Sequence, residues 1–242
     1  MKSPVRDYVC VDLETTGLNP KTDKIIEIGA VRMRDGEIAA RFQSLVNPGR
    51  QLTESACQIT GITQQEVDAA PKAGDILPDF LCFLGEDVLV GHSLLFDFSF
   101  LKKGAVNEGL SLEAKGIDTL KLSRKYLSQL PSRSLEALCR HFSIPHRAHR
   151  ALGDAEATAA LYELLCEKFY EEGAFDPAPL IFHVKKEGPA SRSQKERLLR
   201  LAALYRIPLD VDVETLTRNE ASRLADQLIA RYGRTPHTVE KS

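Results

Sequence analysis

Three strand-like runs of apolar residues come first along the chain, at about residues 6–14, 24–34 and 37–46. Runs of this length, rich in valine and isoleucine, are typical of β-strands. Asp35 and Gly36 separate the second run from the third, and an Asp-Gly pair between two such runs is a strong hairpin signal. We therefore expect the second and third strands to pair antiparallel.

The pattern changes to helical spacing farther along the chain. Apolar residues recur at the period of a helix from Ala73 to Leu84, and a short buried strand follows at residues 87–92. Further helices are expected at about residues 95–107, 119–127, 134–142 and 154–171. Three consecutive strands followed by alternating strands and helices predict an α/β fold with a mixed sheet flanked by helices.

The composition shifts after Gly173 toward proline, alanine and glycine, which indicates a linker. Two helical segments follow, with capping-box signals at Ser193 with Glu196 and at Thr217 with Glu220. We therefore expect a main domain at residues 1–173, a linker at 174–190, a helical hairpin module at 191–235 and a flexible tail at 236–242.

Composition sets the class of protein. The chain has 242 residues, enough for one full domain core and a small second module, and its net charge of -2 does not by itself indicate nucleic-acid binding. Five cysteines without CxxC spacing predict reduced thiols, with Cys10 and Cys82 as small core residues. No apolar run approaches the roughly 18 residues of a membrane helix. We expect a soluble, cytoplasmic protein without membrane contact.

Two carboxylates stand out in the first strand. Asp12 and Glu14 alternate with Val11 and Leu13, so the acids lie side by side on one face and the apolar side chains on the other. Two like charges in a central strand are unfavourable by several kcal/mol unless a cation compensates them. A divalent metal ion is the obvious candidate.

Two further acids and a histidine extend this set. Asp97 falls in the first turn of the helix after the buried strand, with Ser93 as its expected N-cap, where exposed N–H groups favour an anion. His149 and Asp154 are five residues apart and would diverge by about 140° on one continuous helix. Gly153 therefore predicts a helix that starts near Asp154, with His149 on a loop that folds back over it.

Four acids and a histidine suit phosphodiester hydrolysis. Mg²⁺ and Mn²⁺ prefer oxygen ligands, and two such ions about 3.5 to 4 Å apart can stabilise both the attacking and the leaving oxygen. A neutral imidazole, with an ordinary pKa of about 6.5, can take a proton from the attacking water.

Three segments, V-D-L-E-T-T-G, G-H-S-L-L-F-D-F-S-F-L and H-R-A-L-G-D-A-E-A-T, resemble the three exonuclease motifs of the DEDDh family. The chain is most similar to the proofreading (epsilon) subunits of bacterial DNA polymerase III and their stand-alone relatives, over roughly residues 5–172. The resemblance implies a ribonuclease H-like fold and hydrolysis of nucleotides from a 3' end.

The resemblance also implies residue roles. Asp12, Glu14 and Asp154 would hold the first of two Mg²⁺ or Mn²⁺ ions, with Asp12 also reaching the second. Asp97 would act by direct ligation or through a water molecule, and His149 would be the general base.

Pocket residues follow from the same motifs. Thr15, Thr16 and Leu18 would line the pocket for the terminal nucleotide, with an apolar wedge against its base. Relatives often have asparagine after the motif histidine, whereas this chain has Ser93, and His92 is given no catalytic role.

The expected function is a 3' to 5' exonuclease that acts on single-stranded or mispaired DNA 3' ends and releases nucleoside 5'-monophosphates, in proofreading or repair. A 3' to 5' exoribonuclease of the same family is the alternative, since recognition of the 2' hydroxyl separates RNA from DNA. A non-catalytic nucleic-acid-binding adaptor is a third hypothesis, which the complete set of acids disfavours. A DNA polymerase subunit is a candidate partner.

Two groups of residues allow more than one interpretation. Basic residues near His149 either line the path of the nucleic-acid backbone or form a solvated loop; they are Arg140, His141, His146, Arg147 and Arg150. Phe96, Phe98 and Phe100 are interpreted as core residues rather than base-stacking platforms. In the C-terminal module, nine basic residues against six acidic ones suit DNA or protein binding equally.

Overall fold

The computed structural model describes residues 3–146, 149–209 and 211–233. The chain forms two compact units, residues 1–184 and residues 185–242. Each unit has its own hydrophobic core. Arg147 and Ala148, in the loop before His149, lie outside the described residues, as does the expected tail at 236–242.

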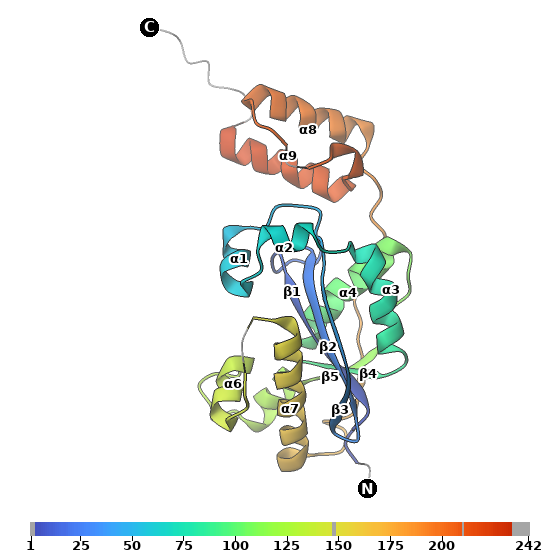
Figure 1. Cartoon of the computed structure of the whole chain (residues 1–242), viewed down its shortest axis with the longest axis vertical. Coiled ribbons are helices and arrows are strands. Elements are labelled where there is room, and N and C mark those ends of the chain that lie inside the picture. Colours follow the sequence, from blue (N-terminus) through green and yellow to red (C-terminus); the bar gives the residue numbers. More distant parts are fainter. Residues whose placement is uncertain (1–2, 147–148, 210, 234–242) are drawn as a thin grey trace. The chain divides into compact units, whose positions relative to one another are not determined.

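A six-stranded mixed sheet organises the first unit, in the order β3-β2-β1-β4-β5-β6 (Figure 1). The strands are β1 (Tyr8–Thr15), β2 (Ile25–Arg34), β3 (Glu37–Leu45), β4 (Val88–Gly91), β5 (Lys115–Asp118) and β6 (Ala178–Pro179). The pairs β1/β2, β2/β3 and β5/β6 are antiparallel, whereas β1/β4 and β4/β5 are parallel. The expected hairpin is confirmed, since Arg34 pairs with Glu37 across Asp35-Gly36. The mixed α/β fold is confirmed as well.

Seven helices belong to the described part of this unit. They are α1 (Glu54–Thr60), α2 (Gln64–Asp68), α3 (Ala73–Leu84), α4 (Leu94–Glu108), α5 (Thr119–Tyr126), α6 (Leu135–Phe142) and α7 (Ala151–Phe169). Helix α7 begins three residues before Asp154, earlier than the glycine signal predicted. The segments that the structure describes contain no helix with the length and apolar character of a membrane span.

The two faces of β1 contact different cores. Val9, Val11 and Leu13 belong to a cluster with buried residues of α3 and α4, whereas Tyr8 and Cys10 belong to a cluster with α7. This alternation puts Asp12 and Glu14 on the α7 side, as the strand pattern predicted. Phe98 and Phe100 are buried, which confirms their assignment to the core.

The cysteine side chains are all free thiols. Cys10 is buried in the sheet, as expected, but Cys82 is exposed, so its assignment to the core was wrong. Cys82 lies on α3, where the apolar spacing continues around the helix, and only the face with Leu77 and Phe80 is fully buried.

Helix α7 crosses β2 at unusually short range. A Cβ atom on Gly29 would lie 2.1 Å from the carbonyl carbon of Ala151 and from the amide nitrogen of Leu152. Gly29 pairs with Asp12 in the β1/β2 register, so the first turn of α7 lies directly beside the strand that carries the acids. The absent side chain at Gly29 is what permits this approach.

The segment after α7 is part of the first unit and packs against its sheet. Phe175 is 1% exposed, and Ala178 and Pro179 pair with Gly116 and Lys115 of β5. The second unit starts at Lys185 in the structure, whereas the sequence analysis put the linker at residues 174–190. The proline-rich composition that suggested a linker is also compatible with a short edge strand.

The second unit contains α8 (Arg192–Tyr205), a single 3₁₀ turn (Val213–Thr215) and α9 (Arg218–Tyr232). Gln194, near the start of α8, bonds Ser222 near the start of α9, and Tyr205 at the end of α8 stacks on Tyr232 at the end of α9. The two helices therefore run in the same direction, not antiparallel as a hairpin would. The return segment between them makes this possible, and its Leu209, Val211 and Val213 pack on the same small core.

The starts of the two helices follow from capping. Helix α9 has the predicted capping box between Thr217 and Glu220. Helix α8 instead uses Ser191 with Gln194, two residues before the predicted Ser193. Ser191 accepts the N–H of Gln194, and the Gln194 side chain accepts the N–H of Ser191, so an amide completes a box that the sequence analysis assigned to a carboxylate.

Candidate active site

Three carboxylates converge where β1 ends and α7 begins. Each of Asp12, Glu14 and Asp154 offers one oxygen, and these atoms all lie within 4.8 Å of one another. Asp12 and Glu14 come from one face of β1, and Asp154 comes from the first turn of α7, which Gly29 allows to approach. The structure therefore brings together three of the four acids at metal-binding distance.

Asp97 completes the acidic set from the other side of β1. It lies in the first turn of α4, is 3% exposed, and its Oδ1 accepts the N–H of Leu13 at 3.1 Å. This bond fixes Asp97 at the peptide between the two β1 acids. The backbone of Ser93 takes the N-cap position in the left-handed region, with φ of 69°, and its side chain makes no cap bond, unlike the expected N-cap.

The electrostatics of the cluster are unfavourable without a cation. Burial, followed by repulsion from Asp97, Asp154 and Glu14, raises the pKa of Asp12 well above its usual range. Burial and then repulsion from Asp154 and Glu27 raise the pKa of Glu14 to about 7. Burial also raises the pKa of Asp97. A bound divalent cation would remove this mutual repulsion.

The donor set fits such a cation. The converging ligands are all carboxylate oxygens, the type preferred by Mg²⁺ and Mn²⁺, and the neighbouring guanidinium of Arg150 is bonded to Glu27. Asp12, Glu14 and Asp154 would hold the ion, with Asp97 beside them.

The loop before α7 places its two histidines differently. The His149 side chain is exposed, while its backbone N–H donates to Asp154 Oδ2 at 2.8 Å, with φ of 67°. The ring of His146 contacts Asp154 Oδ1 through Nε2 at 2.5 Å, and its side chain is 7% exposed. From the sequence, His146 was expected only among the residues that could line the path of the nucleic-acid backbone. The H-x-x-H spacing in front of Asp154 is the signal that would have drawn attention to it.

A fifth carboxylate escaped the sequence analysis altogether. Glu27 on β2 pairs with Glu14 in the β1/β2 register and is 0% exposed. It is the one charged residue in the apolar run Ile25-Ile26-Glu27-Ile28, and this could have drawn attention to it. Its partner strand and register cannot be predicted from that run alone.

The predicted pocket residues lie in and after the end of β1. The Thr15 hydroxyl donates to the carbonyl of Gly17, and the Thr16 hydroxyl accepts the N–H of Lys24 at 3.0 Å. Both threonines thus hold the turn between β1 and β2. Leu18 projects from that turn with 84% of its surface exposed, which is unusual for leucine and leaves it available for an apolar contact.

His92 has a structural environment. Its Nδ1 lies 2.9 Å from the Thr119 hydroxyl, and its Nε2 lies 2.8 Å from the carbonyl oxygen of Arg133. Burial lowers the pKa of this imidazole. The two ring nitrogens therefore bind the segments that follow β4.

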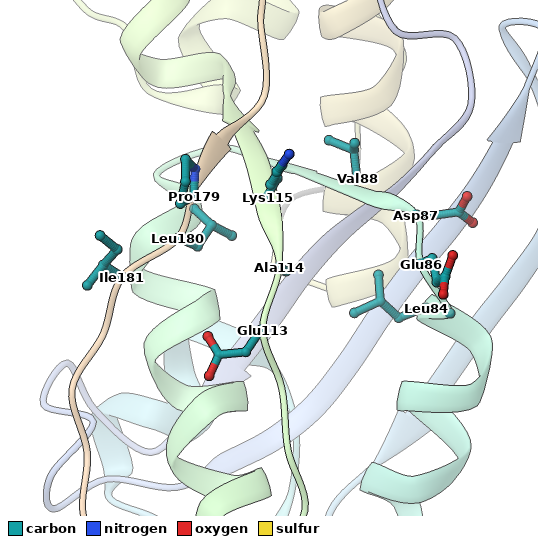
Figure 2. Close-up of a pocket in the computed structure, with 11 residues that line it drawn as sticks. Leu84, Glu86, Asp87, Val88, Glu113, Ala114, Lys115, Pro179, Leu180 and Ile181 are labelled. Atoms are coloured by element: carbon teal, nitrogen blue, oxygen red, sulfur yellow. The ribbon is translucent and has the colours of Figure 1, made fainter.

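A surface hollow of about 690 Å³ lies at the opposite end of the parallel strands (Figure 2). Val88 at the start of β4 and Lys115 at the start of β5 line it, whereas Asp97 follows the far end of β4. The segment with Leu180 and Ile181 runs alongside it. This hollow is separate from the carboxylate cluster.

The mixed sheet carries, at the end of β1, a cluster of three carboxylates that could hold a metal ion. A family model described as Exonuclease (RNase_T) matches residues 9–162, which is more than half of the chain. The chain therefore belongs to this exonuclease family. The resemblance predicted from the three motifs is confirmed.

Relatives and solved structures agree. The PolC-type DNA polymerase III of Clostridium perfringens is 39% identical over 167 residues, covering 69% of this chain and 12% of that protein. The chain thus spans about an eighth of the length of such relatives. Exonuclease X in complex with 5' overhanging duplex DNA is 28% identical, with a TM-score of 0.55 over 67% of this chain and 92% of that chain. The nuclease domain of 3'hExo, a DEDDh family member bound to rAMP, shares the fold at 23% identity, with a TM-score of 0.58 over 74% and 97% of the two chains.

Proposed function

We propose that this chain is a 3' to 5' exonuclease that removes nucleoside 5'-monophosphates from single-stranded or mispaired DNA 3' ends. The observation that carries the proposal is the convergence of the Asp12, Glu14 and Asp154 oxygens within 4.8 Å, beside buried Asp97. A non-catalytic adaptor would not need to retain four acids whose mutual repulsion is unfavourable.

The cofactor proposed is two Mg²⁺ or Mn²⁺ ions, which supply charge stabilisation of the attacking and leaving oxygens. Asp12, Glu14 and Asp154 would hold them, and Asp97, which accepts the Leu13 N–H, would act by direct ligation or through a water molecule. The backbone of His149 is tied to Asp154, which leaves its exposed imidazole free to reach solvent next to the acids and accept a proton from the attacking water.

The proposed substrate contact uses the turn after β1. Leu18 packs its exposed side chain against the terminal base, while the turn that Thr15 and Thr16 hold presents its backbone to the sugar. DNA is proposed over RNA because Exonuclease X, at 28% identity, was solved with DNA, and because the PolC-type relatives are DNA polymerases by name. We accordingly place the activity in proofreading or repair, with a DNA polymerase as the candidate partner.

The test uses the full chain with 5'-labelled oligonucleotides. Single-stranded DNA, duplex DNA with a mispaired 3' end and RNA of matched sequence are incubated with Mg²⁺ or Mn²⁺ or with a chelator. We expect stepwise shortening of both DNAs from the 3' end, with the metals only, and none with Asp12→Asn. Intact DNA with both metals would overturn the proposal, and preferred digestion of RNA would overturn its substrate.

A further inference from the structure

Glu27 makes an unusually complete set of bonds for a carboxylate that is not one of the converging acids. Its two oxygens accept the Arg150 guanidinium at 3.0 and 3.2 Å, the Ala151 N–H at 3.1 Å and the Gln43 side-chain amide at 2.8 Å. The side chain is fully buried. Four donors satisfy it, so it is a specific binding group and not a stray charge.

The groups that Glu27 binds belong to the start of α7. Arg150 is the N-cap residue of that helix and makes no side-chain cap bond of its own, and Ala151 is its first residue. Glu27 therefore serves as the anion at this helix N-terminus, supplied from β2. Gly29, two residues along on the same face of β2, provides the space into which the same turn fits.

Two carboxylates bind successive groups of the chain from His149 to Ala151. On one side Asp154 Oδ2 accepts the N–H groups of His149 and Arg150, at 2.8 and 3.1 Å. On the other side Glu27 binds the next two groups along the chain, the Arg150 side chain and the Ala151 amide. His149 itself has a positive φ of 67°, a conformation that a non-glycine residue keeps only when its surroundings impose it.

A carboxylate at position 27 is electrostatically unfavourable for the cluster, because Glu27 repels both Asp12 and Glu14. A neutral side chain of the same size would pack equally well without that repulsion. The benefit of the charge must then lie in what it binds, which is the Arg150 guanidinium and the first amide of α7.

We propose that Glu27, through Arg150 and the Ala151 amide, is a positioning residue of the exonuclease site that fixes the His149 peptide relative to Asp154. The inference rests on the proposed function and deepens it. Glu27 touches neither substrate nor metal in this role. Its loss changes the placement of the base and leaves the binding of the 3' end intact.

Steady-state kinetics on 5'-labelled single-stranded DNA test this. For Glu27→Gln and Arg150→Gln we expect kcat to fall about 10- to 100-fold with KM within about twofold of wild type, since a misplacement near 1 Å has effects of this size. Arg150→Lys keeps the positive charge but not the two guanidinium N–H groups that bind Glu27 together. It should recover part of the kcat that Arg150→Gln loses.

The matched control is Glu163→Gln. Glu163 also lies on α7 and accepts the Tyr8 hydroxyl at 2.9 Å, but at a distance from the acids along the helix. We expect this variant to lose thermal stability and keep its kcat. Arg150→Gln leaves the fully buried Glu27 carboxylate without its cation and should lose more stability than Glu27→Gln, so Glu27→Gln and Arg150→Lys carry the test if Arg150→Gln does not fold.

The outcomes separate the two proposals. If wild type degrades DNA but Glu27→Gln and Arg150→Gln keep kcat within about twofold, the positioning role is wrong and the exonuclease stands. Equal losses of kcat in Glu163→Gln would also overturn it, because the effect would then be general destabilisation of α7. If wild type is inactive with both metals, the proposed function itself fails, whatever the variants do.

Discussion

Gly29→Ala tests how closely α7 must approach the sheet. The new Cβ would lie 2.1 Å from Ala151 carbonyl carbon and Leu152 nitrogen and 2.4 Å from the Ala151 carbonyl oxygen. All three are backbone atoms, so no side chain can rotate away. Since unbonded carbon atoms pack at about 3.5 to 4.0 Å, the first turn of α7 must retreat by about 1.4 to 1.9 Å.

This retreat acts on stability and on the site. Overpacking of this kind costs about 1 to 3 kcal/mol, which for a domain of this size lowers the melting temperature by about 3 to 10 °C. Asp154 and His149 move with the turn, and a shift near 1 Å at a reacting group reduces kcat about 100-fold. We therefore expect kcat on single-stranded DNA to fall far more than the loss of folded protein explains.

Gly104→Ala is the matched control. It adds the same methyl group in α4, where the nearest atom is Leu77 Cδ1 at 2.8 Å, the end of a flexible side chain. Because the Leu77 side chain can rotate away and alanine is favoured over glycine inside a helix, its melting temperature and its kcat per folded molecule should both stay near wild type. The reasoning is refuted if Gly29→Ala keeps wild-type kcat and melting temperature, or if both variants lose kcat in proportion to stability.

Two more predictions concern pH and the second unit. The pKa of Glu14 is raised to about 7 from 4.5, so between these values the folded state binds more protons than the unfolded state. The metal-free protein should therefore lose stability as pH rises from about 4.5 to 7, by up to about 3 kcal/mol from this group, in urea titrations with chelator. Glu14→Gln should make the profile less steep, since the raised pKa values of Asp12 and Asp97 contribute in the same direction; saturating Mn²⁺ should reverse the slope, and a flat wild-type profile would contradict the pKa shift. Because residues 3–184 hold the whole sheet and all four acids, a 1–184 fragment should fold and cleave DNA with wild-type kcat, and only KM or partner binding should weaken. Circular dichroism checks folding, and a folded but inactive fragment would contradict this division of labour.

The sequence predicted the parts of the site that depend on local pattern. Asp12 and Glu14 share a face because strand alternation is local, and Asp97 follows a helix start that is visible in the motif. The β2/β3 hairpin was predictable from two residues. Each of these features needs only neighbours in sequence.

Features that depend on register or on a distant partner were missed. Glu27 gains its importance from lying opposite Glu14 and beneath α7, and neither relation is encoded within its own strand. The start of α7 at Ala151 depends on the same carboxylate, which is why Gly153 gave a later start. The common direction of α8 and α9 likewise depends on how the return segment packs.

The packing of the first turn of α7 against β2 also has a consequence for the synthesis of the protein. Asp12, Glu14 and Asp97 all precede α7, but Asp154 and His149 arrive only after more than half of the chain has followed Asp12. Domains generally fold as units during synthesis, and contacts between distant parts of the chain form slowly. A nascent chain that ends before α7 therefore holds three of the four acids without the turn that completes the site. Nuclease activity should appear only when this domain is whole.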